Sequence, residues 1–288
     1  MIQTVCIIGA GTMGSGIAQV AAQSGFPTIL FDISNAVLEK SRINIQQSLQ
    51  SLVEKEKITA EQNNSIFQRI QFVNHLNQCI ADIFIEAIVE KLEAKISIFN
   101  QLAAINSFDA IFATNTSSLP VSVIQSGIVN PQRVVGMHFF NPAPVMKLVE
   151  VVKGDQTADA VAEKVYHLCR QFNKIPVMCK DAPGFIVNRV ARHYYLEAMK
   201  MVEEGIASFE TVDTIMESVG FKMGPFKLMD LIGMDVNLAV SQSLYDAFDK
   251  EARFKPSSIQ IEKVSKGELG RKTGKGFYKY PRPLKGSY

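Results

Sequence analysis

A glycine-rich stretch lies near the N-terminus, VCIIGAGTMGSGIA at positions 5–18, and restricts the folds that this chain can adopt. Gly9, Gly11 and Gly14 follow a short apolar run and open a segment of small residues with helical character. A strand, a GxGxxG turn and a helix in this order are typical of the phosphate-binding turn of a dinucleotide-binding βαβ unit. A plain tight turn between a strand and a helix is the alternative, and the surrounding sequence has to decide between them.

The next strand candidate, PTILFD, supports the dinucleotide interpretation because it ends on Asp32. A carboxylate at this place accepts hydrogen bonds from ribose hydroxyls and repels the additional phosphate of NADP. The following residue is Ile33 rather than an arginine that could bind that phosphate. The pattern therefore predicts NAD as the cofactor.

Strand-like runs and helical patterns alternate through the first part of the chain, which predicts an α/β fold with a Rossmann-like, doubly wound sheet. From Ser34 to about Phe67 no strand pattern occurs, and a capping-box motif, TAEQ at 59–62, indicates an inserted pair of helices. Beyond the Pro183–Gly184 pair only helical patterns remain. We expect a Rossmann-like NAD-binding domain at residues 1–183 and a smaller, all-helical C-terminal domain at residues 184–288.

Composition excludes several other classes of protein. The net charge of +2 gives no reason to expect a nucleic-acid partner, and no apolar run approaches the ~18 residues of a membrane span. The four cysteines form no CxxC pair, which favours reduced, buried thiols. We therefore expect a cytoplasmic protein that contacts neither nucleic acid nor membrane.

A carboxylate in the middle of an apolar strand candidate, Glu150 in LVEVV, requires either a partner or an exposed strand edge. His138 is the candidate partner, because it lies near the end of the strand RVVGMHF and the turn NPAPVM could bring the two strands together. A carboxylate that fixes the tautomer of an imidazole prepares it to accept a proton from an alcohol. A structural histidine near an exposed glutamate is the alternative.

Small polar residues follow another strand candidate, in ATNTSSLP at 113–120. Ser117 or Ser118 could cap the following helix, and we expect this role for at least one of them. The carboxyl ends of strands line the ligand crevice of a doubly wound sheet, so a hydroxyl here could also bind substrate. The remaining histidines form no HxxxH or HExxH arrangement, and we expect no metal site.

Seven motifs in order carry a family resemblance: GAGTMGSGIA, EAIVE, ATNTSSLP, GMHFFNPAPVMKLVEVV, KDAPGFIVNR, GPFKLMDLIGMD and GRKTGKGFY. The chain resembles the short-chain L-3-hydroxyacyl-CoA dehydrogenase family as far as about Tyr280. The resemblance implies reversible, NAD-dependent oxidation of a 3-hydroxyacyl-CoA, a short-chain substrate such as 3-hydroxybutyryl-CoA, and a homodimer. It also implies a single-function enzyme, because the chain has no room for the hydratase domain of multifunctional relatives.

The resemblance further implies roles for particular residues. His138 is the catalytic base, Glu150 its partner, and Ser117 and Asn188 bind the reacting oxygen or orient the substrate. The implied cofactor-binding residues are Gly9, Gly11, Thr12, Met13, Gly14, Asp32, Glu90, Lys95, Ser117, Asn141 and Lys272, and the implied CoA-binding residues are Ser48 and Lys55. The C-terminal domain is expected to supply a wall of the acyl pocket and the dimer interface. A dehydrogenase of a free hydroxy acid or sugar acid, and a non-catalytic dinucleotide-binding protein, remain the alternatives.

Overall fold

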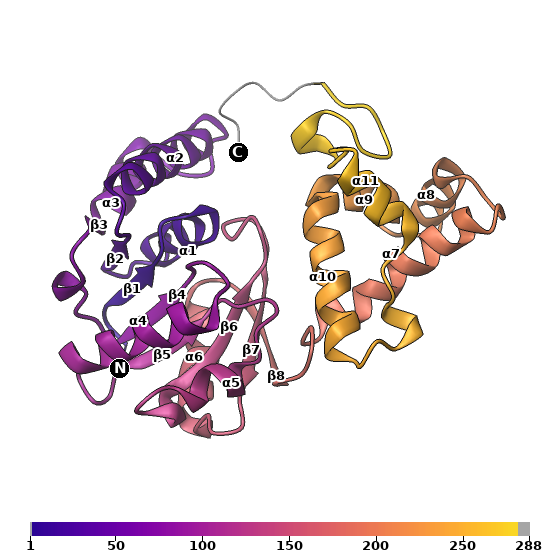
Figure 1. Cartoon of the computed structure of the whole chain (residues 1–288). Coiled ribbons are helices and arrows are strands. Elements are labelled where there is room, and N and C mark those ends of the chain that lie inside the picture. The colour runs from indigo at the N-terminus through magenta and orange to yellow at the C-terminus, as the bar shows by residue number, and fades with distance from the viewer. Residues whose placement is uncertain (1, 282–288) are drawn as a thin grey trace. The chain divides into compact units, whose positions relative to one another are not determined.

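The computed structural model describes residues 2–281, and the chain divides into two compact units, Met1–Ala182 and Pro183–Tyr288 (Figure 1). The first unit combines a sheet with covering helices, and the second is built from helices. The predicted fold class, a Rossmann-like sheet followed by a helical part, is confirmed. Within residues 2–281, no helix is both long and apolar enough to cross a membrane.

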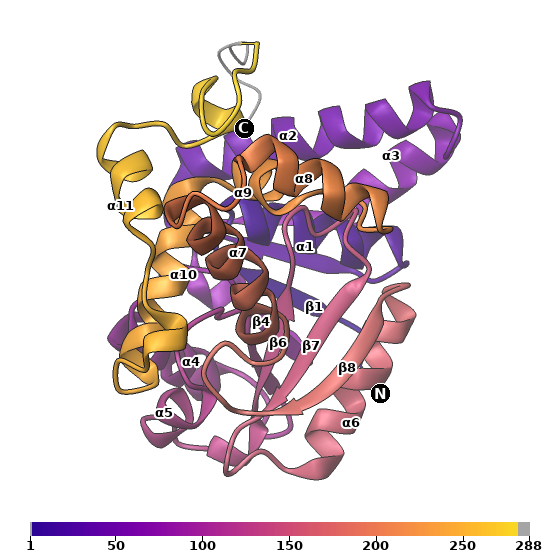
Figure 2. The same cartoon turned by 90° about the vertical axis from the view of Figure 1, so that its right-hand side faces the viewer.

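The sheet of the first unit has the strand order β3-β2-β1-β4-β5-β6-β7-β8. Neighbouring strands are parallel from β3 through β6, β7 runs antiparallel to β6, and β8 is parallel to β7. Figure 2 shows β7 and β8 side by side with α6 next to them. The strand bounds are β1 (Val5–Ile8), β2 (Thr28–Phe31), β3 (Ile70–Val73), β4 (Ile83–Glu86), β5 (Ile111–Thr114), β6 (Val134–Phe139), β7 (Leu148–Lys153) and β8 (Ile175–Lys180).

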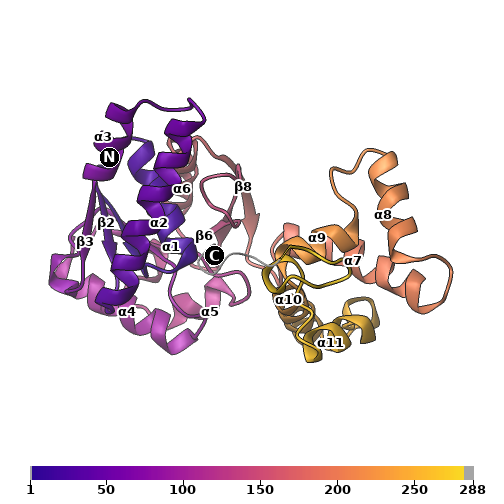
Figure 3. The ribbon, with the colours of Figure 1, turned by 90° about the horizontal axis from the view of Figure 1, so that it is seen from above.

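Helices cover both faces of this sheet, which explains why its inner strands are continuous apolar runs rather than alternating patterns. Figure 3 shows α4 and α5 on one side of the strands and α6 on the other. The helix bounds are α1 (Thr12–Gln23), α2 (Asn35–Glu54), α3 (Ala60–Gln68), α4 (Leu92–Ile105), α5 (Val121–Ser126) and α6 (Asp159–Gln171), with 3₁₀ turns η1 (Leu76–Gln78) and η2 (Pro131–Arg133).

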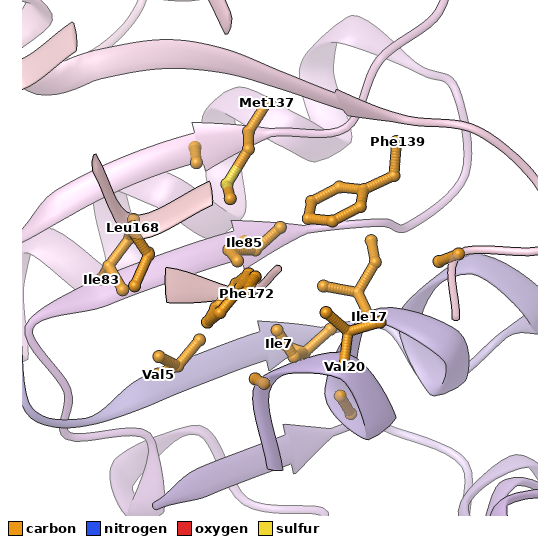
Figure 4. Packing of buried hydrophobic residues seen from close by; sticks show 14 of the residues in the cluster. Val5, Ile7, Ile17, Val20, Ile83, Ile85, Met137, Phe139, Leu168 and Phe172 are labelled. Carbon is orange, nitrogen blue, oxygen red and sulfur yellow. The ribbon is translucent and has the colours of Figure 1, made fainter. Parts of the chain in front are cut away.

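The larger core cluster joins the sheet to α1 and α6 (Figure 4). Alternate residues of β1 and β4, such as Ile7 and Ile85, point toward Ile17 of α1 and Phe172 after α6. On the opposite face, the ring of Phe112 packs against those of Phe84 and Phe99. Because both faces are filled, the polar groups of this unit that can meet a ligand are confined to the strand ends and the loops.

The inserted helix pair predicted from the sequence is α2 and α3. The Thr59 hydroxyl accepts from the backbone N–H of Gln62, whose side chain accepts from the backbone N–H of Thr59, so the predicted capping box is present. The insertion lies between β2 and β3, at the edge of the sheet formed by β3.

The second unit contains five α-helices among its described residues: α7 (Val187–Glu203), α8 (Phe209–Ser218), α9 (Pro225–Ile232), α10 (Met234–Ala247) and α11 (Ser258–Ser265), with η3 (Ala252–Phe254) and η4 (Arg271–Thr273). Two buried carboxylates tie the chain after η4 to the helices. Asp230 accepts from the backbone N–H groups of Phe277 and Tyr278, and Asp213 accepts from the Tyr278 hydroxyl at 2.8 Å. These bonds satisfy charges that would otherwise be costly to bury.

Candidate active site

His138 and Glu150 form a buried pair on adjacent strands. Antiparallel pairing of β6 and β7 places the two residues directly opposite each other, and Nδ1 of His138 lies 2.7 Å from Oε2 of Glu150. The residues are 5% and 1% exposed. The contact predicted from the sequence is therefore present. Because the carboxylate engages Nδ1, it fixes the ring orientation and directs proton exchange to Nε2.

The segment after His138 is held from several sides. The Asn115 side chain accepts from the backbone N–H of Phe139 at 2.8 Å, and the ring of Phe140 packs 4.6 Å from the imidazole. Buried Lys174 donates to the carbonyls of Ala143 and Met146. Burial, with a smaller effect of neighbouring Lys147, lowers the pKa of Lys174 to about 8. These contacts fix the turn that carries Asn141, whose own side chain is exposed.

The three glycines of the opening motif each meet a different geometric demand. Gly9 has a φ of +98°, and a Cβ there would lie 2.7 Å from the carbonyl oxygen of Ala87. A Cβ on Gly14 would lie 1.7 Å from the carbonyl oxygen of Gly9, so only glycine lets α1 pack this closely. At Gly11, no heavy atom of the described residues, apart from those close by along the chain, lies within 4 Å of the Cβ position. The loop is thus tight at Gly9 and Gly14 and open at Gly11.

Asp32 lies beside this loop, directly after β2. Its carboxylate accepts from the backbone N–H groups of Ala10 and Ser34, each at 2.9 Å. A cavity of about 610 Å³ adjoins it, lined by the glycine loop, the end of β2, the segment after β4 and one side of α4. The lining residues include Gly9, Gly11, Asp32, Ile33, Ala87, Ile88, Val89, Ser97, Ile98 and Gln101. The cavity lies at the carboxyl ends of the parallel strands, where doubly wound sheets bind ligands.

A cluster of ionisable groups lies at the end of β4. The Lys95 ammonium is 2.7 Å from both carboxylate oxygens of Glu86 and 3.0 Å from Oε2 of Glu90. Glu86 and Lys95 are buried, whereas the Glu90 side chain is 35% exposed. Burial opposes ionisation of Glu90, but the Lys95 charge and hydrogen bonds from Thr116 and Ser118 outweigh it and lower its pKa.

Glu90 also organises the loop that contains Ser117. Its Oε1 atom accepts from the Thr116 hydroxyl and from the backbone N–H of Ser117 at 3.2 Å. The expectation that Ser117 or Ser118 caps the next helix was wrong, because α5 begins after Pro120 and, among the described residues, no side chain caps it. The Thr116 hydroxyl instead accepts from the backbone N–H of Leu119 at 2.9 Å. The Thr116 side chain closes the turn, and the backbone N–H groups of Ser117 and Ser118 donate to Glu90.

The remaining expected site residues are distributed over both units. Ser48 lies on α2 and Lys55 is the C-cap residue directly after it, two turns further along and therefore on the same side. A separate cavity of about 510 Å³ between α2 and α3 is lined by other residues: Gln46, Gln47, Gln50, Glu54, Asn63, Asn64 and Phe67. In the second unit, Asn188 is the second residue of α7, and the Lys272 ammonium is paired with Asp235 at 2.5 Å.

Glu86 was not identified from the sequence as part of the site. It accepts four hydrogen bonds, two from Lys95, one from the Thr114 hydroxyl and one from the backbone N–H of Ile88. The available signal was a carboxylate at the end of the apolar run DIFIE, the same kind of anomaly that identified Glu150.

Comparisons with known protein families match both units of the chain. Residues 4–182 match the model described as "3-hydroxyacyl-CoA dehydrogenase, NAD binding domain", and residues 184–280 match "3-hydroxyacyl-CoA dehydrogenase, C-terminal domain". The first unit is therefore an NAD-binding domain of this family, which confirms the predicted cofactor.

Curated relatives agree with this assignment. The chain is 48% identical to the 3-hydroxyadipyl-CoA dehydrogenase of Escherichia coli over 96% of its own length and 59% of that protein, so it spans less than two thirds of this relative. It is 41% identical to a probable 3-hydroxybutyryl-CoA dehydrogenase of Deinococcus radiodurans, over 95% of the chain and 99% of that protein.

A solved structure gives the same result. The (S)-3-hydroxybutyryl-CoA dehydrogenase of Ralstonia eutropha superposes with a TM-score of 0.93 at 39% identity, over 98% of this chain and all of that one. The resemblance noted in the sequence is confirmed, and the chain belongs to the 3-hydroxyacyl-CoA dehydrogenase family, a family of NAD-dependent oxidoreductases.

Proposed function

We propose that this chain catalyses the reversible, NAD-dependent oxidation of a (3S)-3-hydroxyacyl-CoA to the corresponding 3-ketoacyl-CoA. The observation that carries the proposal is the buried His138–Glu150 pair on neighbouring strands of an NAD-binding sheet. Relatives with this architecture are named for 3-hydroxybutyryl-CoA and 3-hydroxyadipyl-CoA. A short acyl chain of four to six carbons is therefore the substrate class that we assign.

In the proposed reaction, Nε2 of His138 takes the proton of the 3-hydroxyl group. Glu150 stabilises the imidazolium that forms, because a buried carboxylate next to a new positive charge strengthens the interaction. NAD⁺, held by the glycine loop and Asp32, would supply the hydride acceptor for C3. Ser117 and Asn188 hydrogen-bond the reacting oxygen or orient the substrate. In the reverse direction the same imidazolium returns its proton to the carbonyl oxygen.

The glycine loop and Asp32 fit the assigned cofactor. The open space beside Gly11 lets the backbone approach a pyrophosphate, and the N-terminus of α1 favours negative charge. Asp32 lines the adjoining cavity and is oriented by two backbone N–H groups, so its remaining lone pairs can accept from ribose hydroxyls. The proposed contacts also include Thr12, Met13, Glu90, Ser117, Asn141 and Lys272, whereas buried Lys95 acts on the site through Glu90.

For the CoA moiety, Ser48 and Lys55 are the proposed contacts on one side of α2. We assign the acyl-pocket wall and the dimer interface to the helical second unit. A homodimer and a cytoplasmic location stay predictions of the sequence, and size-exclusion chromatography with light scattering tests the first of them.

The function is tested by NADH formation with purified protein. We expect turnover of (3S)-3-hydroxybutyryl-CoA and 3-hydroxyadipyl-CoA, with long-chain thioesters much slower. Absence of NADH formation with every 3-hydroxyacyl-CoA, and of NADH consumption with every 3-ketoacyl-CoA, would overturn the proposal if the protein is folded.

Two glycine substitutions separate a folding role from a cofactor role. Gly14→Ala is expected to lower the unfolding free energy by about 3 kcal/mol, because its Cβ overlaps a backbone carbonyl. Gly11→Ala should leave stability within about 0.5 kcal/mol and weaken NAD binding at least about tenfold by filling the open space. Denaturant unfolding and NAD titration measure both, and an unchanged NAD affinity in Gly11→Ala would contradict the assigned phosphate position.

Cofactor choice is expected to depend on the Asp32 carboxylate. NAD should give a much higher kcat/KM than NADP. Asp32→Ser should lower the ratio of kcat/KM with NAD to kcat/KM with NADP by about 10- to 100-fold, because the substitution removes a charged hydrogen-bond acceptor for the ribose and a charge that repels the additional phosphate. The measurement is kcat/KM with both cofactors for both proteins. Equal use of NADP by the unmodified protein would refute this role of Asp32.

A further inference from the structure

The ionisable cluster at the end of β4 contains more negative than positive groups. Glu86 and Glu90 contribute two carboxylates, and Lys95 contributes one ammonium that contacts both. Glu86 is the acceptor in all four of its hydrogen bonds, as an ionised carboxylate is. With both carboxylates ionised, the cluster carries a net charge of −1. Lys91, the neighbouring cation, is exposed, so water screens its charge.

The position of this surplus charge is set by the fold. Glu86 is the last residue of β4, and Ala87, Ile88 and Val89 immediately after it line the cavity next to the glycine loop. Glu90 follows and contacts the backbone N–H of Ser117, the residue proposed to contact the reacting oxygen. The surplus charge therefore lies between the cavity next to the glycine loop and the segment that carries Ser117, at the carboxyl ends of β4 and β5.

Burial makes this charge effective. Glu86 and Lys95 are 0% and 1% exposed, and the Glu90 carboxylate is held by Thr116, Ser117 and Ser118. Charges in such a site are weakly screened and act over several ångströms. The two redox forms of the cofactor differ in charge, because the nicotinamide ring of NAD⁺ is cationic and that of NADH is neutral.

We propose that the Glu86–Lys95–Glu90 cluster uses its surplus negative charge to favour binding of NAD⁺ over NADH, with Glu86 acting through Lys95 and Glu90 rather than by contact with the cofactor. The cluster thereby biases the enzyme toward binding the oxidised cofactor. This inference rests on the proposed function, since it requires that the protein binds NAD.

The test measures dissociation constants for NAD⁺ and NADH separately, by calorimetry and NADH fluorescence, without turnover. Glu86→Gln removes the surplus charge, and we expect it to lower the ratio Kd(NADH)/Kd(NAD⁺) by about three- to tenfold. A change in packing alone would weaken the binding of NAD⁺ and NADH equally and leave this ratio unchanged. Glu93→Gln is the matched control, because it removes a carboxylate from an exposed position on α4, the helix that carries Lys95. Its ratio should equal that of the unmodified protein.

A second variant covers the case in which Glu86→Gln does not fold, since the change places an amide donor against other donors. Glu90→Gln removes the same charge at a partly exposed position. Any contact of Glu90 with a ribose is common to both redox forms, so the ratio again isolates the charge, and it should fall at least threefold. An unchanged ratio in the folded variants overturns the inference. If the unmodified protein binds neither NAD⁺ nor NADH, the proposed function fails instead.

Discussion

His138→Ala is expected to lower kcat for oxidation of (3S)-3-hydroxybutyryl-CoA by about 10²- to 10⁴-fold, the usual contribution of a general base. The substitution removes the imidazole that contacts the buried Glu150 carboxylate, so we expect lower stability, and rates are compared once circular dichroism shows the variant folded. The dissociation constant for NAD should change little, since the glycine loop and Asp32 lie on other elements. Initial rates of NADH formation, together with NAD titration, measure both quantities.

A matched control is available in the same unit. His167→Ala removes an exposed histidine from α6 and should leave kcat unchanged. Near-normal turnover in a folded His138→Ala protein would contradict the assigned base and return the pair to a structural role.

The second large effect concerns the thioester. A free 3-hydroxy acid is expected to react with a kcat/KM at least about 100-fold lower than its CoA thioester, because binding energy from the remote CoA moiety helps to position the reacting carbon. Rates for 3-hydroxybutyrate and 3-hydroxybutyryl-CoA, measured at the same NAD concentration, give the ratio. Similar values for the two would instead favour a dehydrogenase of free hydroxy acids.

One residue makes the CoA assignment more specific. Lys55→Ala should raise the KM for the thioester about three- to tenfold through loss of a charged contact and leave the Kd for NAD unchanged. Lys57→Ala, which removes an exposed lysine two residues away, is the control. Equal effects of the two substitutions would argue against a specific contact at Lys55.

The central pair could be predicted from the sequence because its signal is local and physically unusual. Glu150 interrupts an otherwise apolar run, and a short turn separates that run from the strand that carries His138. A turn of this length returns the chain beside the first strand, and antiparallel register then places the two side chains opposite each other. The glycine pattern was similarly predictable, because Gly9 and Gly14 satisfy close backbone approaches and Gly11 leaves open space, as the motif indicates.

The loop around Ser117 could not be predicted in the same way. Helix capping is a local preference, and it favoured a serine. The structure instead uses Glu90, distant in sequence, to bind the backbone N–H groups of Ser117 and Ser118. The burial of Lys95 against two carboxylates also depends on packing of α4 over the sheet, which a pattern of residue types does not specify.

A double-mutant cycle on His138 and Glu150, measured as kcat for oxidation of a 3-hydroxyacyl-CoA, tests whether the two residues act together. Glu150→Gln alone should lower kcat, because it removes the charge that stabilises the imidazolium and changes the hydrogen bond that fixes the tautomer. In the His138→Ala background the carboxylate has no imidazole to orient, so the double variant should match His138→Ala within about twofold. Losses that multiply, with both single variants folded and binding NAD normally, would contradict the claim that the two residues act as one proton-accepting unit.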